Sequence, residues 1–197
     1  MKNKFTDFKN IHAGSKFLVI GCGESASLAP SVKDVITIGV NDIGRLLTPD
    51  YLLVVNTKAA FAEDRWIYTE KSRAKYVFTH LSDLPISNKD KVVQFKLGRY
   101  RNITLGNDTL DYSNNSPYMA CLLAYYMGAS KIGLLGVDFT DNHFFAKTGK
   151  HPLSTRIKEI QTEYSKMLMS LLEKNVQLVN LSQKSLLTLP KCDIGSF

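Results

Sequence analysis

The chain has 197 residues, 44% of them hydrophobic and 22% charged, a composition typical of globular proteins that excludes disordered and fibrous chains. No apolar run approaches the roughly 18 residues that cross a membrane, and the basic N-terminal stretch lacks the apolar core of a signal peptide. We therefore expect a cytoplasmic protein without a membrane span, in which residues 1–197 form one domain. The net charge of +7 favours an anionic partner such as a nucleotide, a nucleic acid or an acidic glycan.

The first predicted strand, residues 16–20, ends in the turn GCGESA. Glycines directly after a parallel strand let the backbone approach a phosphate or a ribose, and a serine hydroxyl adds a donor near the start of the next helix. The turn therefore predicts that Gly21, Gly23 and Ser25 bind a nucleotide. A tight strand-to-helix turn that binds nothing explains the same GxGxxA pattern, so this alternative stays open.

Two further strands are each predicted to end at an asparagine. Residues 34–40 lead into Asn41, and residues 51–55 lead into Asn56. A carboxamide offers both donors and an acceptor without adding charge, which suits the edge of a nucleobase or a ribose hydroxyl. Asparagine is also favoured in turns that bind no ligand. Its recurrence at two strand ends favours nucleotide binding by both residues.

A buried helix and a central strand are predicted in the middle of the chain. Ser116 is expected to cap the helix and Pro117 to occupy its first turn. Residues 118–127 are apolar on almost every face, which indicates a helix buried on several sides, and Gly128 supplies a left-handed stop. Residues 131–137 then form the near-continuous apolar run of a strand covered on both faces.

Polar side chains follow this central strand. Ligands of parallel sheets bind beyond the carboxyl ends of the strands. The residues predicted to lie at a functional site are therefore Gly136, Asp138, Thr140, Asp141, Asn142 and His143. Asp138 is the candidate catalytic residue of this group, although an isolated aspartate more simply caps a turn. Further on, His151 precedes Pro152 in a basic loop, and a neutral imidazole in that position can accept a proton from a hydroxyl.

Helix-like and strand-like segments alternate along the whole chain. Besides the segments above, residues 59–73 and 155–173 are predicted helices, and residues 76–80, 92–96 and 176–181 are predicted strands. This alternation predicts a single Rossmann-like α/β domain, with a mainly parallel sheet and helices on both faces. The three cysteines form no CxxC pair, so neither a zinc site nor a disulfide framework is expected.

Several of these segments together resemble the bacterial sialyltransferase-type glycosyltransferase fold. The resemblance rests on the turn GCGESASL, Asn41, the stretch SNNSPYMACLLAYYMGASKIGLLGVDF, His151 and the closing LLEKNVQLVNLSQKSLL. The chain is also similar to a related group that includes flagellin-glycosylation motility accessory factors and archaeal hydroxymethylpterin pyrophosphokinases. The resemblance spans most of the chain.

The resemblance implies roles for individual residues. In the sialyltransferases, the first turn and the asparagine after the second strand hold the nucleotide, a serine-rich turn before the buried helix contacts nucleotide and phosphate, and a histidine is the general base. The base would then be His151. Nucleotide binding would fall to Gly21, Gly23, Ser25, Asn41, Asn115 and Ser116.

The chain departs from the family pattern in two places. Cys22 and Glu24 stand where the family has asparagine and proline. The family's phosphate-holding tyrosines are missing from the loop after the Gly-x-Asp-Phe strand, which here carries Thr140 and His143. The resemblance therefore implies a nucleotide-sugar as co-substrate but does not identify it as CMP-sialic acid.

The residues and the resemblance together predict a glycosyltransferase. His151 would deprotonate an acceptor hydroxyl, on a glycan or on a hydroxymethylated base of a nucleic acid, for attack on the anomeric carbon. The sequence has no Asp-x-Asp, so no obligatory metal is expected. Two alternatives stay open: a Mg²⁺-dependent pyrophosphokinase that uses Asp138 and Asp141, and a non-catalytic nucleotide-binding module.

Overall fold

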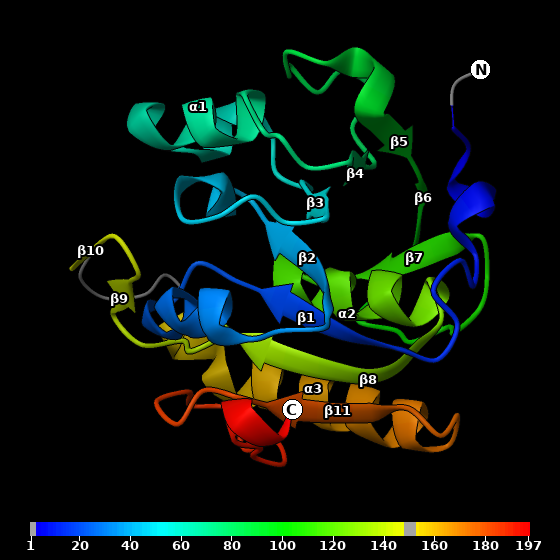
Figure 1. Cartoon of the computed structure of the whole chain (residues 1–197), viewed down its shortest axis with the longest axis vertical. Helices are drawn as coiled ribbons and strands as arrows, with labels where there is room; N and C mark the ends of the chain where they lie inside the picture. Colours follow the sequence, from blue (N-terminus) through cyan, green and yellow to red (C-terminus); the bar gives the residue numbers. More distant parts are fainter. Residues whose placement is uncertain (1–2, 148–152) are drawn as a thin grey trace.

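The computed structural model describes residues 3–147 and 153–197. Its centre is a seven-stranded sheet with the strand order β11-β8-β1-β2-β3-β4-β5, in which all neighbours are parallel (Figure 1). The strands are β1 (Ser15–Ile20), β2 (Ile36–Val40), β3 (Tyr51–Leu53), β4 (Tyr76–Thr79), β5 (Val92–Gln94), β8 (Ala129–Leu135) and β11 (Gln177–Asn180). This sheet confirms the predicted α/β class, and every predicted strand overlaps an observed one.

Helices and two small sheets complete the described part of the chain. The α-helices are α1 (Glu63–Glu70), α2 (Ser116–Tyr126) and α3 (Ile157–Leu172). Short 3₁₀ helices are η1 (Phe5–Phe8), η2 (Glu24–Ser31), η3 (Ile43–Arg45), η4 (Lys58–Ala60), η5 (Lys89–Lys91), η6 (Ser154–Arg156) and η7 (Ile194–Ser196). The small sheets pair β6 (Lys96–Tyr100) with β7 (Thr109–Tyr112), and β9 (Asn142–His143) with β10 (Ala146–Lys147).

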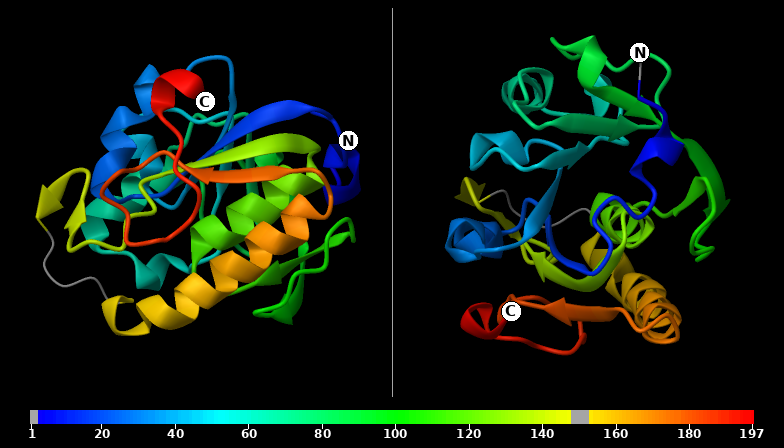
Figure 2. Two further views of the ribbon diagram at one scale, coloured as in Figure 1. Left: turned by 90° about the horizontal axis from the view of Figure 1, so that it is seen from below. Right: turned by 45° about the vertical axis from the view of Figure 1, so that its right-hand side comes forward.

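The sheet is covered on both faces, as predicted. Alternate residues of β1 point to opposite sides, so Phe17 enters the core formed with α2 and α3, whereas Leu18 enters the core formed with η2 and α1. Figure 2 shows α2 and α3 side by side under the sheet and η2 on the other side. Tyr118 of α2 meets Tyr164 of α3 edge to face, with 5.9 Å between ring centroids.

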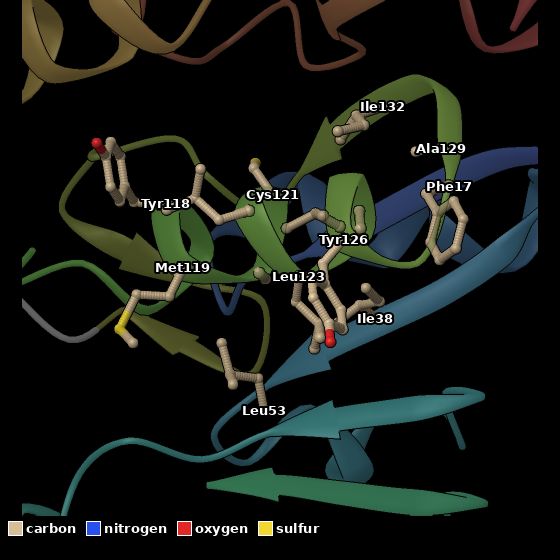
Figure 3. Close-up of a cluster of buried hydrophobic side chains, with 14 of the residues drawn as sticks. Phe17, Ile38, Leu53, Tyr118, Met119, Cys121, Leu123, Tyr126, Ala129 and Ile132 are labelled. Atoms are coloured by element: carbon tan, nitrogen blue, oxygen red, sulfur yellow. The ribbon is translucent and has the colours of Figure 1, made fainter. Parts of the chain in front are cut away.

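Helix α2 is buried on nearly every side. Tyr118 and Leu123 are at most 1% exposed, and the helix as a whole packs against β1, β2 and β8 (Figure 3). The helix ends before Gly128, whose φ of +100° belongs to the left-handed region that glycine adopts without a Cβ clash. A helix that is apolar all round is stable only in such a position, which explains why the sequence pattern predicted its burial.

The predicted cap of α2 is wrong by one residue. The helix begins at Ser116, as expected, but the N-cap is Asn115, whose Oδ1 accepts the N–H of Tyr118 at 3.3 Å. Both residue types are good caps, so the preceding asparagine takes the role when the helix includes the serine. The consequence is that Asn115 is held rigidly at the start of α2.

Other boundaries differ from the predictions. The crossover helix predicted over residues 59–73 is only the two turns of α1, because few of its side chains reach the core; Trp66 is one of them, at 2% exposed. Helix α3 starts two residues later than predicted, after η6. The pairs β6–β7 and β9–β10 were not predicted at all, since they are short and lack a continuous apolar pattern.

A carboxylate joins the amino ends of β2 and β3. Asp50 Oδ2 accepts the N–H and the hydroxyl of Thr37 at 2.9 and 2.8 Å, and Oδ1 accepts a hydrogen bond from Lys75 Nζ at 2.8 Å. Burial acts to raise the pKa of Asp50, but the hydrogen bonds from Lys75 and Thr37 outweigh it and hold the pKa below its ordinary value. This contact stabilises the amino ends of β2 and β3, on the opposite side of the sheet from the carboxyl ends.

The helices offer no candidate for a membrane span. None of those in residues 3–147 and 153–197 is both long and apolar enough to cross a bilayer.

Candidate functional site

A cavity of about 310 Å³ opens at the carboxyl ends of the strands. Its walls come from the loops after β1, β2, β3 and β8 and from the start of α2, which is where parallel α/β sheets bind ligands. Predicted site residues in the lining are Gly23, Asn41, Asn56, Asn115, Ser116, Asp138, Thr140 and His143. The fold thus brings eight residues from distant parts of the sequence around one volume.

Close packing of two loops explains the glycines. A Cβ on Gly21 would lie 2.3 Å from the carbonyl oxygen of Gly136, and a Cβ on Gly136 would lie 2.4 Å from that of Gly21. Gly23 donates its N–H to the Gly136 oxygen at 2.8 Å and lines the cavity, whereas Gly21 lies behind it. Gly21 therefore has a packing role that is independent of any ligand.

Ser25 and Asp138 join the same two loops through hydrogen bonds. The N–H of Ser25 donates to Asp138 Oδ2 at 2.8 Å, and its hydroxyl donates to Oδ1 at 2.7 Å. The same hydroxyl accepts the N–H of Gly136 at 2.7 Å. Ser25 is 5% and Asp138 1% exposed. Ser25 does not line the cavity, so its hydroxyl serves the loop contact, while Asp138 lines the cavity with both carboxylate oxygens already hydrogen-bonded.

Three side chains in the cavity wall carry buried polar atoms without a partner. Within the described part of the chain, Asn41 Oδ1, Asn115 Nδ2 and Thr140 Oγ1 make no hydrogen bond. A buried polar group without a partner costs about 1–3 kcal/mol, so three of them around one cavity indicate a place where a bound ligand or water completes their hydrogen bonds. They offer a ligand an acceptor, a donor and a hydroxyl.

The amide of Asn115 is oriented by two contacts. Its Oδ1 accepts the N–H of Tyr118 at 3.3 Å and faces the hydroxyl of Tyr164 at 3.4 Å. Because a backbone N–H can only donate, the oxygen of Asn115 must face the helix, and the unpaired Nδ2 is left as a fixed donor. Next to it, the start of α2 adds the positive end of the helix dipole.

The loop after β8 closes one side of the cavity. Phe139 has a φ of +57°, a strained conformation for a bulky side chain and one that tends to occur at functional sites. Asn41 also has a positive φ, of +54°, which asparagine tolerates more easily. His143 forms an isolated bridge with Gly23, so the hairpin β9–β10 lies against the first loop.

An ion pair at the edge of the cavity involves none of the predicted site residues. Arg65 of α1 lines the cavity and pairs through two hydrogen bonds with Asp42, which is fully buried. The Cys22 thiol lies 3.5 Å from the same carboxylate. Burial is the main cause that raises the pKa of this thiol, and the negative charge of Asp42 raises it further, so Cys22 stays protonated. No local pattern marks Arg65, because it is one arginine on a charged helix face.

The remaining positions to be placed are His151, Asn114 and Asn142. His151 lies outside the described residues, so its role stays a prediction. Asn142, predicted with the other residues of the loop after β8, lines the cavity; Asn114 also lines it and was not predicted, although it adjoins Asn115. A larger cavity of about 630 Å³ lies along α3, away from the strand ends, but none of the unpaired buried polar atoms found in the described chain belongs to its lining.

No protein-family model matches the chain, and no curated protein matches it in sequence. Solved structures do match. The sialyltransferase CstII from Campylobacter jejuni with CMP-3FNeuAc gives a TM-score of 0.53 at 13% identity, covering 93% of this chain and 88% of that chain. CstII with cytidine-5'-monophosphate gives 0.52 at 15% identity, covering 94% and 88%.

A second kind of enzyme shares the fold. The MAf glycosyltransferase from Magnetospirillum magneticum AMB-1 gives a TM-score of 0.61 at 11% identity, over 98% of this chain but only 38% of that chain. At these identities the similarity concerns the fold, which is the coarse part of the resemblance seen in the sequence. The chain therefore has the fold of the CstII sialyltransferase and of a part of the MAf glycosyltransferase.

Proposed function

We propose that the protein is a glycosyltransferase that binds a nucleotide-sugar in the cavity at the strand ends. The observation that carries the proposal is the set of unpaired buried atoms on Asn41, Asn115 and Thr140, gathered in one cavity. Neutral donors and acceptors of this kind suit a nucleobase and the hydroxyls of a sugar. The CstII structures with CMP and with a CMP-sugar analogue support a donor of this class, because the fold is the same.

In this proposal His151 is the general base. It takes the proton of the acceptor hydroxyl, the hydroxyl oxygen attacks the anomeric carbon, and the bond between that carbon and the donor phosphate breaks, so that the nucleotide leaves with the bonding electrons. Asp138 acts by fixing the loop after β8 through Ser25, because its carboxylate is already bound there. The start of α2, next to Asn115, adds the positive end of a helix dipole to the electrostatic field of the cavity.

The acceptor belongs to one of two chemical classes, a glycan or a hydroxymethylated base in a nucleic acid. The net charge of +7 is compatible with both. Binding to a nucleic acid would weaken steeply as salt is raised, because bound cations are released from the phosphates, whereas binding to a neutral glycan would not. The slope of affinity against salt concentration therefore separates the two.

A Mg²⁺-dependent pyrophosphokinase receives less support. Both oxygens of Asp138 accept hydrogen bonds from Ser25, which leaves one lone pair on each oxygen for the metal that this alternative requires. Over the described ranges, no three His, Cys, Asp or Glu side chains come together as a metal-binding group. A non-catalytic nucleotide-binding module fits the cavity equally well and differs only in lacking turnover.

The test is a two-stage experiment on the full chain. Thermal unfolding is measured with CMP-, UDP-, GDP- and ADP-sugars, since a ligand that binds only the native state raises Tm. Hydrolysis or transfer of the stabilising donor is then followed for the wild type and for His151→Ala. The proposal expects one donor class to bind and the variant to bind it with little turnover. Equal turnover in the variant would show that His151 is not the base, and binding without any turnover in the wild type would favour the non-catalytic module.

A further inference from the structure

The guanidinium of Arg65 is held at the edge of the cavity by a buried carboxylate. Arg65 Nε donates to Asp42 Oδ2 at 2.9 Å, and Nη2 donates to Oδ1 at 2.5 Å. Asp42 has no exposed surface, whereas the side chain of Arg65 is 24% exposed. The positive end of the pair therefore faces the cavity, and the negative end is enclosed. Of the five N–H donors of an arginine, three remain on the side away from Asp42.

A second contact restrains the same guanidinium. The ring of Phe145, in the hairpin β9–β10, has its centroid 5.3 Å from Arg65 Cζ and 4.4 Å from Arg45 Cζ. The contact with the Phe145 ring and the two hydrogen bonds to Asp42 together restrict the rotation of the Arg65 side chain. An anion that binds to it thus loses little free energy to ordering of the side chain.

Arg65 is also the only lysine or arginine among the described residues that line the cavity. The other polar groups there are amides, hydroxyls, the Cys22 thiol, the His143 imidazole and the Asp138 carboxylate, and the last of these is committed to Ser25. A negatively charged group that enters the cavity therefore finds its strongest hydrogen-bond donor at Arg65.

We infer that Arg65 binds the phosphate of the nucleotide and that Asp42 acts as its positioning residue. This inference rests on the proposed function, because it assigns the charged part of the donor to a particular side of the same cavity. The base and ribose are then left for the neutral groups on Asn41, Asn115 and Thr140. During transfer the leaving phosphate gains negative charge, so Arg65 would bind it more strongly than in the intact donor.

The test compares nucleotides with their nucleosides, so that only the phosphate differs. CMP, UDP, GDP and ADP, together with cytidine, uridine, guanosine and adenosine, are titrated calorimetrically into the full-length protein. Arg65→Gln alone would leave the Asp42 charge buried and unpaired, which endangers folding. The double variant Asp42→Asn/Arg65→Gln removes both charges, so that no buried carboxylate is left unpaired, and Arg65→Lys keeps the charge without the planar fork.

We expect the double variant to bind the preferred nucleotide roughly ten- to 100-fold more weakly, as for loss of a hydrogen bond to a charged group, and the nucleoside unchanged. Arg65→Lys should fall between it and the wild type. Arg45→Gln is the matched control, because Arg45 contacts the same Phe145 ring but does not line the cavity, and it should bind as the wild type does.

The outcomes separate this inference from the proposed function. The inference is overturned, while the nucleotide site stands, if the wild type binds nucleotide and nucleoside equally. It is also overturned if the ratio of nucleotide affinity to nucleoside affinity is the same in the double variant as in the wild type. If the wild type binds none of the four nucleotides, the proposed nucleotide site itself is overturned.

Discussion

The contact between Ser25 and Asp138 makes the strongest stability prediction. Replacing Ser25 with alanine removes the hydroxyl that donates to Asp138 Oδ1 at 2.7 Å and accepts the N–H of Gly136 at 2.7 Å. The change leaves one carboxylate oxygen with a donor fewer and one backbone N–H buried without a partner. The N–H of Ser25 still reaches Oδ2, so the carboxylate does not become entirely unpaired.

The expected loss follows from these two changes. A hydrogen bond to a charged group contributes about 1.5–3 kcal/mol, and a buried unsatisfied N–H costs about 1–3 kcal/mol. Partial relaxation of the loop reduces their sum, so we expect Ser25→Ala to lower the free energy of unfolding by about 3 kcal/mol. For a chain of this size, each kcal/mol corresponds to roughly 2–4 °C, which gives a fall in Tm of roughly 6–12 °C.

Urea unfolding followed by the fluorescence of the single tryptophan, Trp66, measures this loss, since its ring is buried in the folded state. Ser27→Ala is the matched control: it lies in the same η2 helix, but its hydroxyl donates to the Glu24 carbonyl at the surface, and we expect a change within about 0.5 kcal/mol. If Ser25→Ala were as stable as Ser27→Ala, the described hydrogen bonds would not hold the two loops together.

Three further predictions concern packing, the cavity and pH. Gly21→Ala places a Cβ 2.3 Å from the Gly136 oxygen and should destabilise by about 2–3 kcal/mol, whereas Gly195→Ala meets no atom within 4 Å and should not; equal urea midpoints would contradict the loop geometry. Thr140→Val removes an unpaired buried hydroxyl, so we expect it to raise the free energy of unfolding by about 1 kcal/mol, and with it Tm, while it weakens nucleotide binding. A lower Tm with unchanged affinity would show that the hydroxyl has a partner within the protein. Asp50 has a lowered pKa, so its stabilisation is present above its unfolded pKa of about 3.9 and is lost as the pH falls through the lower folded pKa. Asp50→Asn should therefore flatten the fall in stability between about pH 5 and pH 2, and a curve as steep as that of the wild type would refute the assignment.

The elements that could be predicted from the sequence are those whose own apolar pattern shows that they are buried. The apolar run of β8 and the all-round apolar surface of α2 need no partner to be recognised, because only a central strand and an enclosed helix tolerate them. The short pairs β6–β7 and β9–β10 depend on pairing between segments, so local patterns could not predict them. The length of α1 could not be predicted either, because weak burial shortens this helix.

The candidate site shows the same division. Asn41, Asn56 and Thr140 could be named as candidates because each follows a strand, and parallel strands end at one edge of the sheet. Arg65 could not, since its meaning depends on Asp42, which lies 23 residues earlier and is buried next to it only in the folded chain. Likewise, only the fold shows that Ser25 is engaged with Asp138, whereas the sequence pattern indicated a phosphate donor.

Hydrogen–deuterium exchange with and without the nucleotide-sugar that most stabilises the protein tests the central claim most directly. If the donor occupies the strand-end cavity, exchange slows in residues 22–25, 41–45, 114–118 and 136–143, which line it or adjoin its lining. Exchange in residues 161–170, beside the larger cavity along α3, stays the same. Protection confined to residues 161–170 would contradict the account, because the ligand would then bind away from the carboxyl ends of the strands.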